Sequence, residues 1–328
     1  MKTFMLVILL IAACLFTSMD GIAQDNNSKI KSDQYTIVIH GGAGTISEDM
    51  PDSVKEAYLN SLKKALQIGK DILAKGGTSL DAVEKVINYF ENDPKFNAGI
   101  GAVYTSAGTH EMDAAIMDGR DLSCGAVAGV EHIPHPISLA RLVMEKTPHV
   151  LLAYQGAENF AESMGIKLVP QSYFDTPERL KQLQDYKKKL EEGKHGTVGC
   201  AALDKYGNLA AGTSTGGMTN KLPGRIGDSP LIGDGTYANN KTCAVSCTGW
   251  GEKFIKHTVA FNVSALIEYK GMTLKQAADE MIYKQLDPND GGLIAVDKNG
   301  NYAMPFSTSG MFRGVANSSG TFEVKIWK

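Results

Sequence analysis

The sequence predicts an α+β fold in which sheets are covered by helices. One observation is the order of the segments: a strand, helices, strands, helices, and then strands, helices and strands again. Another is that residues 197–215 and 231–248 are rich in Val, Ala, Thr and Gly, as packed strands with close backbone approach are. Because strands and helices come in separate runs, the order favours layered sheets and helices over a continuous βαβ series.

The first part of the chain begins with YTIVIH (35–40), a short apolar, β-branched run that predicts a buried strand, and GGAG follows it as a glycine loop. Residues 52–75 carry apolar side chains three or four apart, which predicts a helix ending at Gly76-Gly77. A further helix is expected over 78–93, because Thr78 can cap its start and Pro94 follows its end. Strands are then expected around 111–117 and 122–130, and helices over about 136–146 and 150–164.

Residues 178–194 contain 10 charged residues in 17 and predict a frayed helix or a mobile linker. Beyond Thr197 come the small-residue strands described above. Helical patterns return at roughly 251–269 and 273–285, and short strands are expected at roughly 292–297, 301–305 and 322–327.

The N-terminal segment predicts export. An apolar run from Phe4 to Ala13 is too short for a membrane span but suits a signal-peptide core, and a cut after Ala23 fits the small-residue rule. We therefore expect residues 1–23 to be a signal peptide and the protein to be periplasmic. A lipoprotein anchored through Cys14 is the alternative.

Charge and cysteine content exclude several classes of protein. The formal net charge of -3 gives no reason to expect nucleic acid or an anionic membrane as a partner. No later segment is apolar for long enough to form a stable membrane span. Beyond Cys14 there are four cysteines, too few for a disulfide scaffold, and we expect them to be buried, free thiols.

Several common catalytic motifs are missing from the sequence. HGGAG lacks the G-x-G-x-x-G spacing, and no Gly-Lys-Ser/Thr triplet or G-x-S-x-G elbow occurs. His132 and His135 flank Pro134 and fit a turn better than a metal site. The motifs therefore give no support to a nucleotide site, a metal hydrolase or a Ser-His-Asp triad.

Hydroxyl side chains are concentrated in the second half, in GTSTGG (212–217) and SCTGWG (246–251). Between these clusters Arg225 and Asp228 lie three apart in a glycine-proline loop. A guanidinium binds a carboxylate and a carboxylate holds an ammonium, so this pair could bind an amino acid head group. An ordinary surface ion pair is the alternative.

Thr197 lies where the charged segment meets a small-residue strand. A threonine hydroxyl is a poor nucleophile without a base, and the α-amine of an N-terminal threonine is one such base. That amine has an ordinary pKa near 7.7–8.0. Cleavage after Gly196 would create it, and glycine tolerates the strained backbone that an acyl shift requires. A hinge between linker and strand is the alternative reading.

At these residues the chain resembles the plant-type asparaginase and isoaspartyl peptidase family, which are N-terminal nucleophile (threonine) hydrolases. The resemblance covers nearly the whole chain after the N-terminal segment, in seven blocks. The blocks are IHGGAG (39–44), GTSLDAVEKVI (77–87), FNAGIGAVYT (96–105), EMDAAIMDG (111–119), GAVAGVEHIPHPISLAR (125–141), the long block from His195 to Ala238, and SCTGWGE (246–252).

The resemblance implies a four-layer αββα sandwich and a precursor that cuts itself between Gly196 and Thr197. The products would be an α subunit of residues 24–196 and a β subunit of residues 197–328, assembled as a dimer of such pairs. Thr197 would be the autocleavage residue and the nucleophile, and its free amine the base. Thr215 would hydrogen-bond it, and Asn97 would lie close by.

The same resemblance implies the substrate contacts. Thr248 and the Gly249 amide would form the oxyanion hole. Arg225 would bind the substrate α-carboxylate and Asp228 its α-ammonium. L-Asparagine and isoaspartyl dipeptides would both be hydrolysed to L-aspartate, because they present the same aspartyl end. No cofactor is expected for the chemistry, although backbone carbonyls of residues 90–96 correspond to a loop that holds a sodium ion in relatives.

Two alternatives remain at this point. A glycosylasparaginase would share the nucleophile and the Arg/Asp pair, but His40-Gly41-Gly42 and Gly196 before the threonine favour the isoaspartyl peptidase branch. An uncleaved, inactive aspartyl-binding protein is the alternative of another class. Asp234 stands where relatives often have a small residue. Trp250 is expected to narrow or line the leaving-group side, and packing against the helix after it is the alternative.

Overall fold

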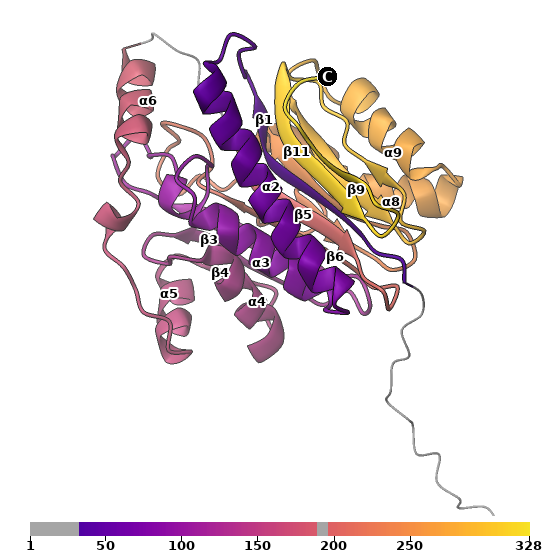
Figure 1. Ribbon diagram of the computed structural model, residues 1–328. Coiled ribbons are helices and arrows are strands. Elements are labelled where there is room, and N and C mark those ends of the chain that lie inside the picture. The colour runs from indigo at the N-terminus through magenta and orange to yellow at the C-terminus, as the bar shows by residue number, and fades with distance from the viewer. Residues whose placement is uncertain (1–32, 189–195) are drawn as a thin grey trace, which may run out of the picture.

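The computed structural model describes residues 33–188 and 196–328, which form two β-sheets with helices on both sides (Figure 1). The expected signal peptide (residues 1–23), Cys14 and the end of the charged segment lie outside the described residues. Within those two ranges no helix is long and apolar enough to cross a membrane. The α+β class predicted from the order of segments is confirmed.

The larger sheet has eight strands in the order β12-β11-β1-β5-β6-β2-β3-β4. Its neighbouring strands are antiparallel except for β3 and β4, which are parallel. In chain order the strands are β1 (Thr36–Gly44), β2 (Met112–Asp118), β3 (Cys124–Val130), β4 (Leu151–Ala153), β5 (Val198–Leu203), β6 (Leu209–Thr215), β11 (Gly310–Asn317) and β12 (Phe322–Lys325). Strand β5, which follows Thr197, therefore lies in the centre of the sheet.

Helices cover one face of this sheet. Thr78 caps α3, where its hydroxyl oxygen accepts a hydrogen bond from the Asp81 amide at 3.1 Å. Alternate strand residues such as Ile37 and Ile39 pack with Leu62, Val83 and the neighbouring helical side chains in the largest apolar cluster. The helices of this part of the chain are α2 (Asp52–Ala74), α3 (Ser79–Glu91), α4 (Pro136–Lys146), α5 (Tyr154–Ser163) and α6 (Pro177–Lys187).

The smaller sheet has four antiparallel strands in the order β10-β9-β8-β7. A second apolar cluster joins it to α8 and α9, and a third contains side chains of both sheets, including Val38, Ala201, Ala244 and Ile294. The elements are β7 (Thr236–Ala238), β8 (Cys243–Gly249), β9 (Gly291–Asp297), β10 (Tyr302–Ala303), α7 (Gly251–His257), α8 (Val259–Lys270) and α9 (Leu274–Glu280), which continues as a π-helical turn, Met281–Gln285.

The structure corrects some local predictions and decides between the two readings of another. GGAG (41–44), expected as a loop, is the end of β1. Strand β11 was not predicted, although it pairs directly with β1, because Arg313 and several small residues interrupt its β-like pattern. Residues 150–164 are the short strand β4 followed by α5, not one helix. Of the two readings of 178–194, the described part is a helix, α6, anchored by the buried Arg179. The four cysteines are free, as expected, although Cys124 is only half-buried.

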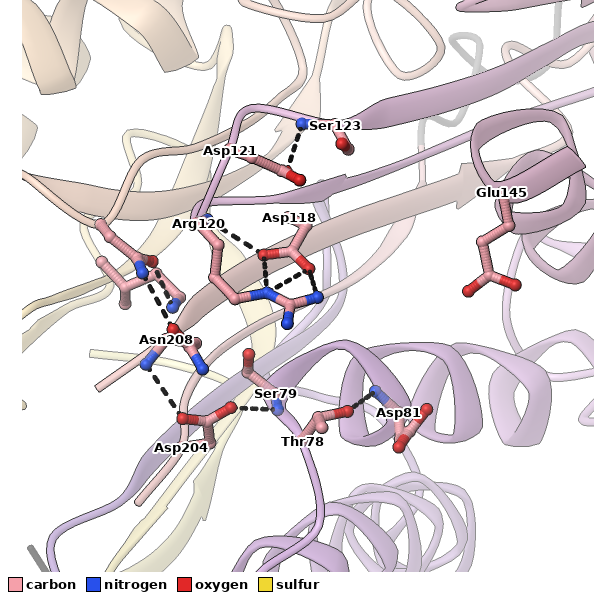
Figure 2. A network of polar contacts seen from close by, with 12 residues as sticks. Thr78, Ser79, Asp81, Asp118, Arg120, Asp121, Ser123, Glu145, Asp204 and Asn208 are labelled. Carbon is pink, nitrogen blue, oxygen red and sulfur yellow. Dashed lines mark hydrogen bonds and ion pairs between the residues drawn. The ribbon is translucent and has the colours of Figure 1, made fainter. Parts of the chain in front are cut away.

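A polar network lies where β5 ends and β6 begins, at the other end of these strands from Thr197 (Figure 2). The buried Asp204 carboxylate accepts hydrogen bonds from the backbone amides of Ser79 at 3.0 Å and of Tyr206 and Asn208, each at 2.9 Å. It therefore links the β5–β6 turn to the first turn of α3. Thr197 lies at the opposite end of these strands.

Candidate active site

Three threonines expected at the site lie at corresponding ends of three strands. Thr197 directly precedes β5, Thr215 is the last residue of β6, and Thr248 is the penultimate residue of β8. All three are buried. The hydroxyl of Thr197 donates a hydrogen bond to the Thr215 hydroxyl oxygen at 3.1 Å. The structure thus brings Thr197 and Thr215 together, as predicted.

The carbonyl group of Gly196 is held by two side chains. Its oxygen accepts hydrogen bonds from Asn97 Nδ2 at 2.6 Å and from the Thr215 hydroxyl at 3.0 Å. Thr215 Oγ1 also accepts a bond from the Gly217 amide at 2.9 Å. Because Thr215 gives its one proton to Gly196, its oxygen is left to accept from Thr197. These contacts polarise the peptide bond between Gly196 and Thr197.

The GGAG segment (41–44), which forms the end of β1 after an irregularity between His40 and Gly42, lies against that bond. Gly42 has φ = +112°, and a Cβ atom at this position would lie 3.2 Å from Gly196 Cα and 3.4 Å from Thr197 N. A side chain would therefore strain the backbone and press on the peptide bond. The next residue, Ala43, donates its amide to Thr248 Oγ1 at 3.1 Å. This places Thr248 beside the GGAG segment. The Thr248 hydroxyl oxygen accepts in this bond, so its own proton can be donated to another group.

Gly249 follows Thr248 in a conformation that side chains rarely adopt. Its φ is +150°, and a Cβ atom would lie 2.1 Å from the carbonyl oxygen of Asp290. The chain at this point therefore requires glycine.

Arg225 and Asp228 lie near one another, but Arg225 makes its ion pair with a different residue. Its Nε and Nη2 atoms donate to the Glu252 carboxylate at 2.9 and 2.8 Å. A Cβ atom on Gly251 would lie 2.9 Å from both Arg225 Nη2 and Asp228 Oδ1, so both charged groups face this glycine. Sequence reasoning missed Glu252. Its position directly after the hydroxyl cluster and Gly251 was the available signal.

The Asp228 carboxylate is buried, and its Oδ2 atom has no hydrogen-bond partner within the described residues. Burial raises its pKa to about 7, against the smaller opposing effect of hydrogen bonding and of the Arg225 charge. A buried carboxylate oxygen that lacks a donor is what a pocket for an ammonium group requires.

Asp234 and Trp250 both follow Asp228 in the sequence. Burial raises the pKa of Asp234 to about 6. The Trp250 side chain is 44% exposed, and the Lys253 ammonium lies 5.8 Å from the centre of its ring. Trp250 directly precedes α7, and its amide donates to the Asp290 carbonyl at 2.7 Å.

His40 is a contact of Thr197 that sequence reasoning did not identify. His40 Nδ1 lies 2.9 Å from the Thr197 carbonyl oxygen, and Nε2 lies 2.9 Å from Ser246 Oγ. Complete burial lowers the pKa of His40 to about 3, so the ring is neutral at neutral pH. The signal in the sequence was a histidine two residues before the glycine that approaches Thr197.

The backbone of the segment expected to hold sodium is tightly folded. A Cβ atom on Gly101 would lie 1.9 Å from the Phe96 carbonyl oxygen and 2.7 Å from that of Pro94. One on Gly99 would lie 2.2 Å from the Glu91 carbonyl oxygen. Carbonyl groups of this loop therefore crowd around two glycines. In the part of the chain that the structure describes, no group of three or more His, Cys, Asp or Glu side chains could hold a metal ion.

Comparison with known proteins places this site in a family. The family described as asparaginase matches residues 33–326. An isoaspartyl peptidase of Salmonella typhimurium is 48% identical over 89% of this chain and 98% of its own length. An isoaspartyl peptidase of Escherichia coli is 46% identical over 89% and 96%, and a human isoaspartyl peptidase/L-asparaginase is 45% identical over 84% and 91%.

The same comparison corrects the expectation of export. These bacterial and human relatives are enzymes of the cytosolic type, so the prediction of a periplasmic or lipid-anchored protein was wrong. The family match extends from before β1 to the end of β12 and includes every predicted site residue. The chain therefore belongs to the asparaginase family of N-terminal nucleophile hydrolases.

Proposed function

We propose that the protein hydrolyses isoaspartyl dipeptides and L-asparagine to release L-aspartate, after cutting itself between Gly196 and Thr197. The observation that carries the proposal is the arrangement around the Gly196 carbonyl, where Asn97 and Thr215 both donate to its oxygen. The relatives named isoaspartyl peptidase and L-asparaginase support the choice of substrates.

In self-cleavage the Thr197 hydroxyl oxygen attacks the carbonyl carbon of Gly196. Negative charge then develops on the oxygen that Asn97 Nδ2 and the Thr215 hydroxyl already contact, so these donors stabilise it. Collapse breaks the C–N bond, and the proton lost by the hydroxyl passes to the leaving nitrogen. The Gly196 acyl group then stays on Thr197 Oγ1, and the Thr197 amine is free. Water then hydrolyses the ester, giving one subunit that ends at Gly196 and a second of residues 197–328.

In substrate hydrolysis the freed amine acts as the base for its own hydroxyl. Thr197 attacks the side-chain carbonyl of asparagine or the β-linked carbonyl of an isoaspartyl dipeptide. The Thr248 hydroxyl and the Gly249 amide stabilise the oxyanion, the amine returns the proton to the leaving group, and water releases aspartate. Arg225 binds the substrate α-carboxylate and Asp228 its α-ammonium.

The charges of the pocket support this assignment. Arg225 meets Glu252 edge to edge, which orients the guanidinium and leaves Nη1 for a second carboxylate. The Asp228 Oδ2 atom lacks a donor among the described residues, as an ammonium-binding atom does before substrate arrives. A substrate with a blocked amino group would leave this carboxylate buried and unpaired.

We also infer the finer architecture that the family resemblance implies, a four-layer αββα sandwich. Its support is the succession of three apolar clusters: helices on the large sheet, sheet on sheet, and the small sheet on α8 and α9. Assembly as a dimer of subunit pairs is proposed from the resemblance, and light scattering after size-exclusion chromatography tests it.

A sodium ion held by backbone carbonyls of residues 90–96 is a further proposal. The crowding of the Glu91, Pro94 and Phe96 carbonyl groups around Gly99 and Gly101 fits an oxygen-rich cradle for a hard cation. The loop leads directly to Asn97, so an ion would stabilise the position of that side chain. Replacing sodium chloride with choline chloride at constant ionic strength should lower the melting temperature, and an unchanged value would reject the ion.

The deciding experiment has two steps. Wild-type protein should give two fragments on a denaturing gel and Thr197→Ala a single band. Processed protein is then assayed for kcat/KM with β-Asp-Leu, L-asparagine and a glycosylated asparagine. Turnover of the first two supports the proposal, preference for the third indicates a glycosylasparaginase, and an intact chain without turnover indicates a binding protein.

A further inference from the structure

We propose that His40 is a positioning residue that holds the Thr197 peptide plane, and that the buried hydroxyls of Ser246 and Thr213 fix the ring in the tautomer this requires. The inference rests on the proposed function, because it concerns the same nucleophile. It adds a second row of polar side chains to the threonine site. This row lies two residues away along the strands, further into the space between the two sheets.

The row is set by strand register. In the large sheet His40 of β1 pairs with Gly199 of β5, and Gly199 pairs with Thr213 of β6. In the small sheet Ser246 pairs with Thr236. Side chains two apart on a strand point to the same face. The row of Gly199, Thr213 and Ser246 therefore lies on the same strand faces as the site threonines. Each of its members is two residues from Thr197, Thr215 or Thr248.

Hydrogen bonds connect the side chains of this second row across the space between the two sheets. His40 Nε2 lies 2.9 Å from Ser246 Oγ, Ser246 Oγ lies 2.7 Å from Thr213 Oγ1, and Thr236 Oγ1 lies 2.6 Å from Thr213 Oγ1. All four side chains are fully buried. The neighbouring inter-sheet positions, such as Val38, Ala211 and Ala244, are apolar, so the polar row is confined to the end that carries Thr197.

The partners determine where each proton lies. A carbonyl oxygen can only accept, so the 2.9 Å contact with Thr197 places the ring proton on His40 Nδ1. In a neutral ring Nε2 then accepts, and Ser246 must donate to it. Since the single proton of Ser246 is used there, Thr213 donates to Ser246. Each hydroxyl thus orients the next group, and the series ends at the nucleophilic residue.

Gly199 provides the space for this contact. A Cβ atom there would lie 2.0 Å from Ser246 Oγ and 2.3 Å from His40 Nε2. Those distances exclude any side chain, so the glycine two residues after the nucleophile is required by the histidine and the serine.

The function of the contact follows from self-cleavage. Before the cut, Thr197 is held by peptide bonds on both sides and by the contacts to Gly196. Afterwards its amino side is free, and its orientation depends on its hydroxyl partner and on the carbonyl bonded to His40. A displacement of about 1 Å at a nucleophile can cost roughly a hundredfold in rate. Loss of the His40 bond should therefore lower kcat and leave KM, which Arg225 and Asp228 determine, nearly unchanged.

Two substitutions at one position test this. In His40→Asn the side-chain Nδ2 lies near the place of the ring Nδ1 and can donate to Thr197, whereas in His40→Gln the longer amide reaches towards Ser246 instead. We expect kcat for β-Asp-Leu to fall about a hundredfold in His40→Gln. In His40→Asn the decrease should be smaller by a factor of about ten or more, and KM should stay within about threefold of wild type in both variants. Equal kcat values in both variants, measured on folded and processed protein, would overturn the proposal.

A second pair avoids substitutions of the histidine. Thr213→Val removes a hydroxyl of the row without changing side-chain shape, and Thr242→Val does the same at a buried hydroxyl that contacts Ser264 Oγ at 2.6 Å. Thr213→Val should lower kcat by roughly threefold to tenfold, as loss of one hydrogen bond in the series does, and Thr242→Val should not. Similar kcat values for the two variants would reject the role of the row.

These outcomes are separate from the test of the proposed function. If wild-type protein neither cuts itself nor hydrolyses β-Asp-Leu, the proposed function fails. If wild type is active and the His40→Gln and Thr213→Val variants have wild-type kcat, only the positioning role fails.

Discussion

Asn97 Nδ2 lies 2.6 Å from the carbonyl oxygen of Gly196, although 99 residues separate them in the sequence. The same nitrogen donates to the Gly217 carbonyl at 2.7 Å, and Asn97 Oδ1 accepts from the Val103 amide at 3.0 Å. The amide is therefore held from three directions and cannot rotate away from the bond to be cut.

Asn97→Leu should slow self-cleavage about a hundredfold or more, because one of the two donors to the developing oxyanion is lost. The measurement is the fraction of intact chain on denaturing gels over time after purification. Asn159→Leu, a change of the same kind at an exposed position of α5, is the control and should mature at the wild-type rate. Wild-type maturation of Asn97→Leu would contradict the role assigned to the amide.

Arg225→Lys should raise KM for L-asparagine and lower kcat/KM about a hundredfold, because an ammonium cannot bind Glu252 and a substrate carboxylate with the paired geometry of a guanidinium. Steady-state kinetics measure the effect. The matched control is Arg120→Lys, since Arg120 binds Asp118 through Nε at 2.9 Å and Nη2 at 2.6 Å at the opposite end of the sheet (Figure 2). Equal kinetics in the two variants would remove Arg225 from the pocket.

The pKa of about 7 for Asp228 predicts a pH dependence of substrate capture. Below that pH the carboxyl is protonated and cannot hold an ammonium, so kcat/KM should rise with pH through about 7 and then level off. A bound ammonium favours the ionised form of Asp228. The corresponding limb of the profile of kcat against pH, the part in which kcat rises with pH, should therefore lie at lower pH. The limb of the Thr197 amine, by contrast, should be present in both parameters.

Asp228→Asn should abolish that limb and leave a low kcat/KM. Asp234→Asn, the same change at a neighbouring carboxyl, should keep the limb and move it to slightly lower pH, because the Asp234 charge raises the pKa of Asp228. A limb near pH 7 that persists in Asp228→Asn would show that another group produces it.

Trp250→Ala tests the expectation that this half-exposed ring lines the leaving-group side. The leaving group of a dipeptide is an amino acid, whereas that of asparagine is only ammonia. The variant should therefore lose more kcat/KM for β-Asp-Leu than for L-asparagine. Removal of an aromatic contact should change the ratio of the two kcat/KM values by roughly tenfold. An unchanged ratio of the two kcat/KM values would show that Trp250 does not contact the leaving group.

Asp204→Ala should destabilise the fold by about 2–3 kcal/mol, because three backbone amides lose a charged acceptor. Thermal unfolding measures the change, and kcat of the folded variant should be near wild type. Asp121→Ala is the control: Asp121 is exposed and accepts one bond, from the Ser123 amide at 3.0 Å (Figure 2), so its loss should cost less than about 0.5 kcal/mol. Equal losses in both variants would show that the network contributes nothing specific.

Much of the fold could be predicted from local pattern, since α2, α3 and α4 follow the expected apolar spacing and stop signals. β11 could not, although it lies within the large sheet between β12 and β1. Its Arg313 is accommodated because the guanidinium donates to the carbonyl groups of Met311, Ile326 and Trp327. Two of these acceptors, Ile326 and Trp327, follow β12, which comes beside β11 only in the fold.

The sequence by itself determined the family of the chain and predicted the residues of the proposed site: Thr197 after a glycine, the second threonine at 215, and the Arg225 and Asp228 loop. The tertiary structure decided how they are held. In the fold the Asn97 side chain donates to the Gly196 carbonyl and Arg225 pairs with Glu252. The His40 ring lies between the Thr197 carbonyl and the Ser246 hydroxyl and contacts both. Local pattern predicts strands and turns because their side-chain periods are short-range. Hydrogen bonds between strands distant in the chain depend on register and on the packing of one sheet upon another, which no short-range period encodes.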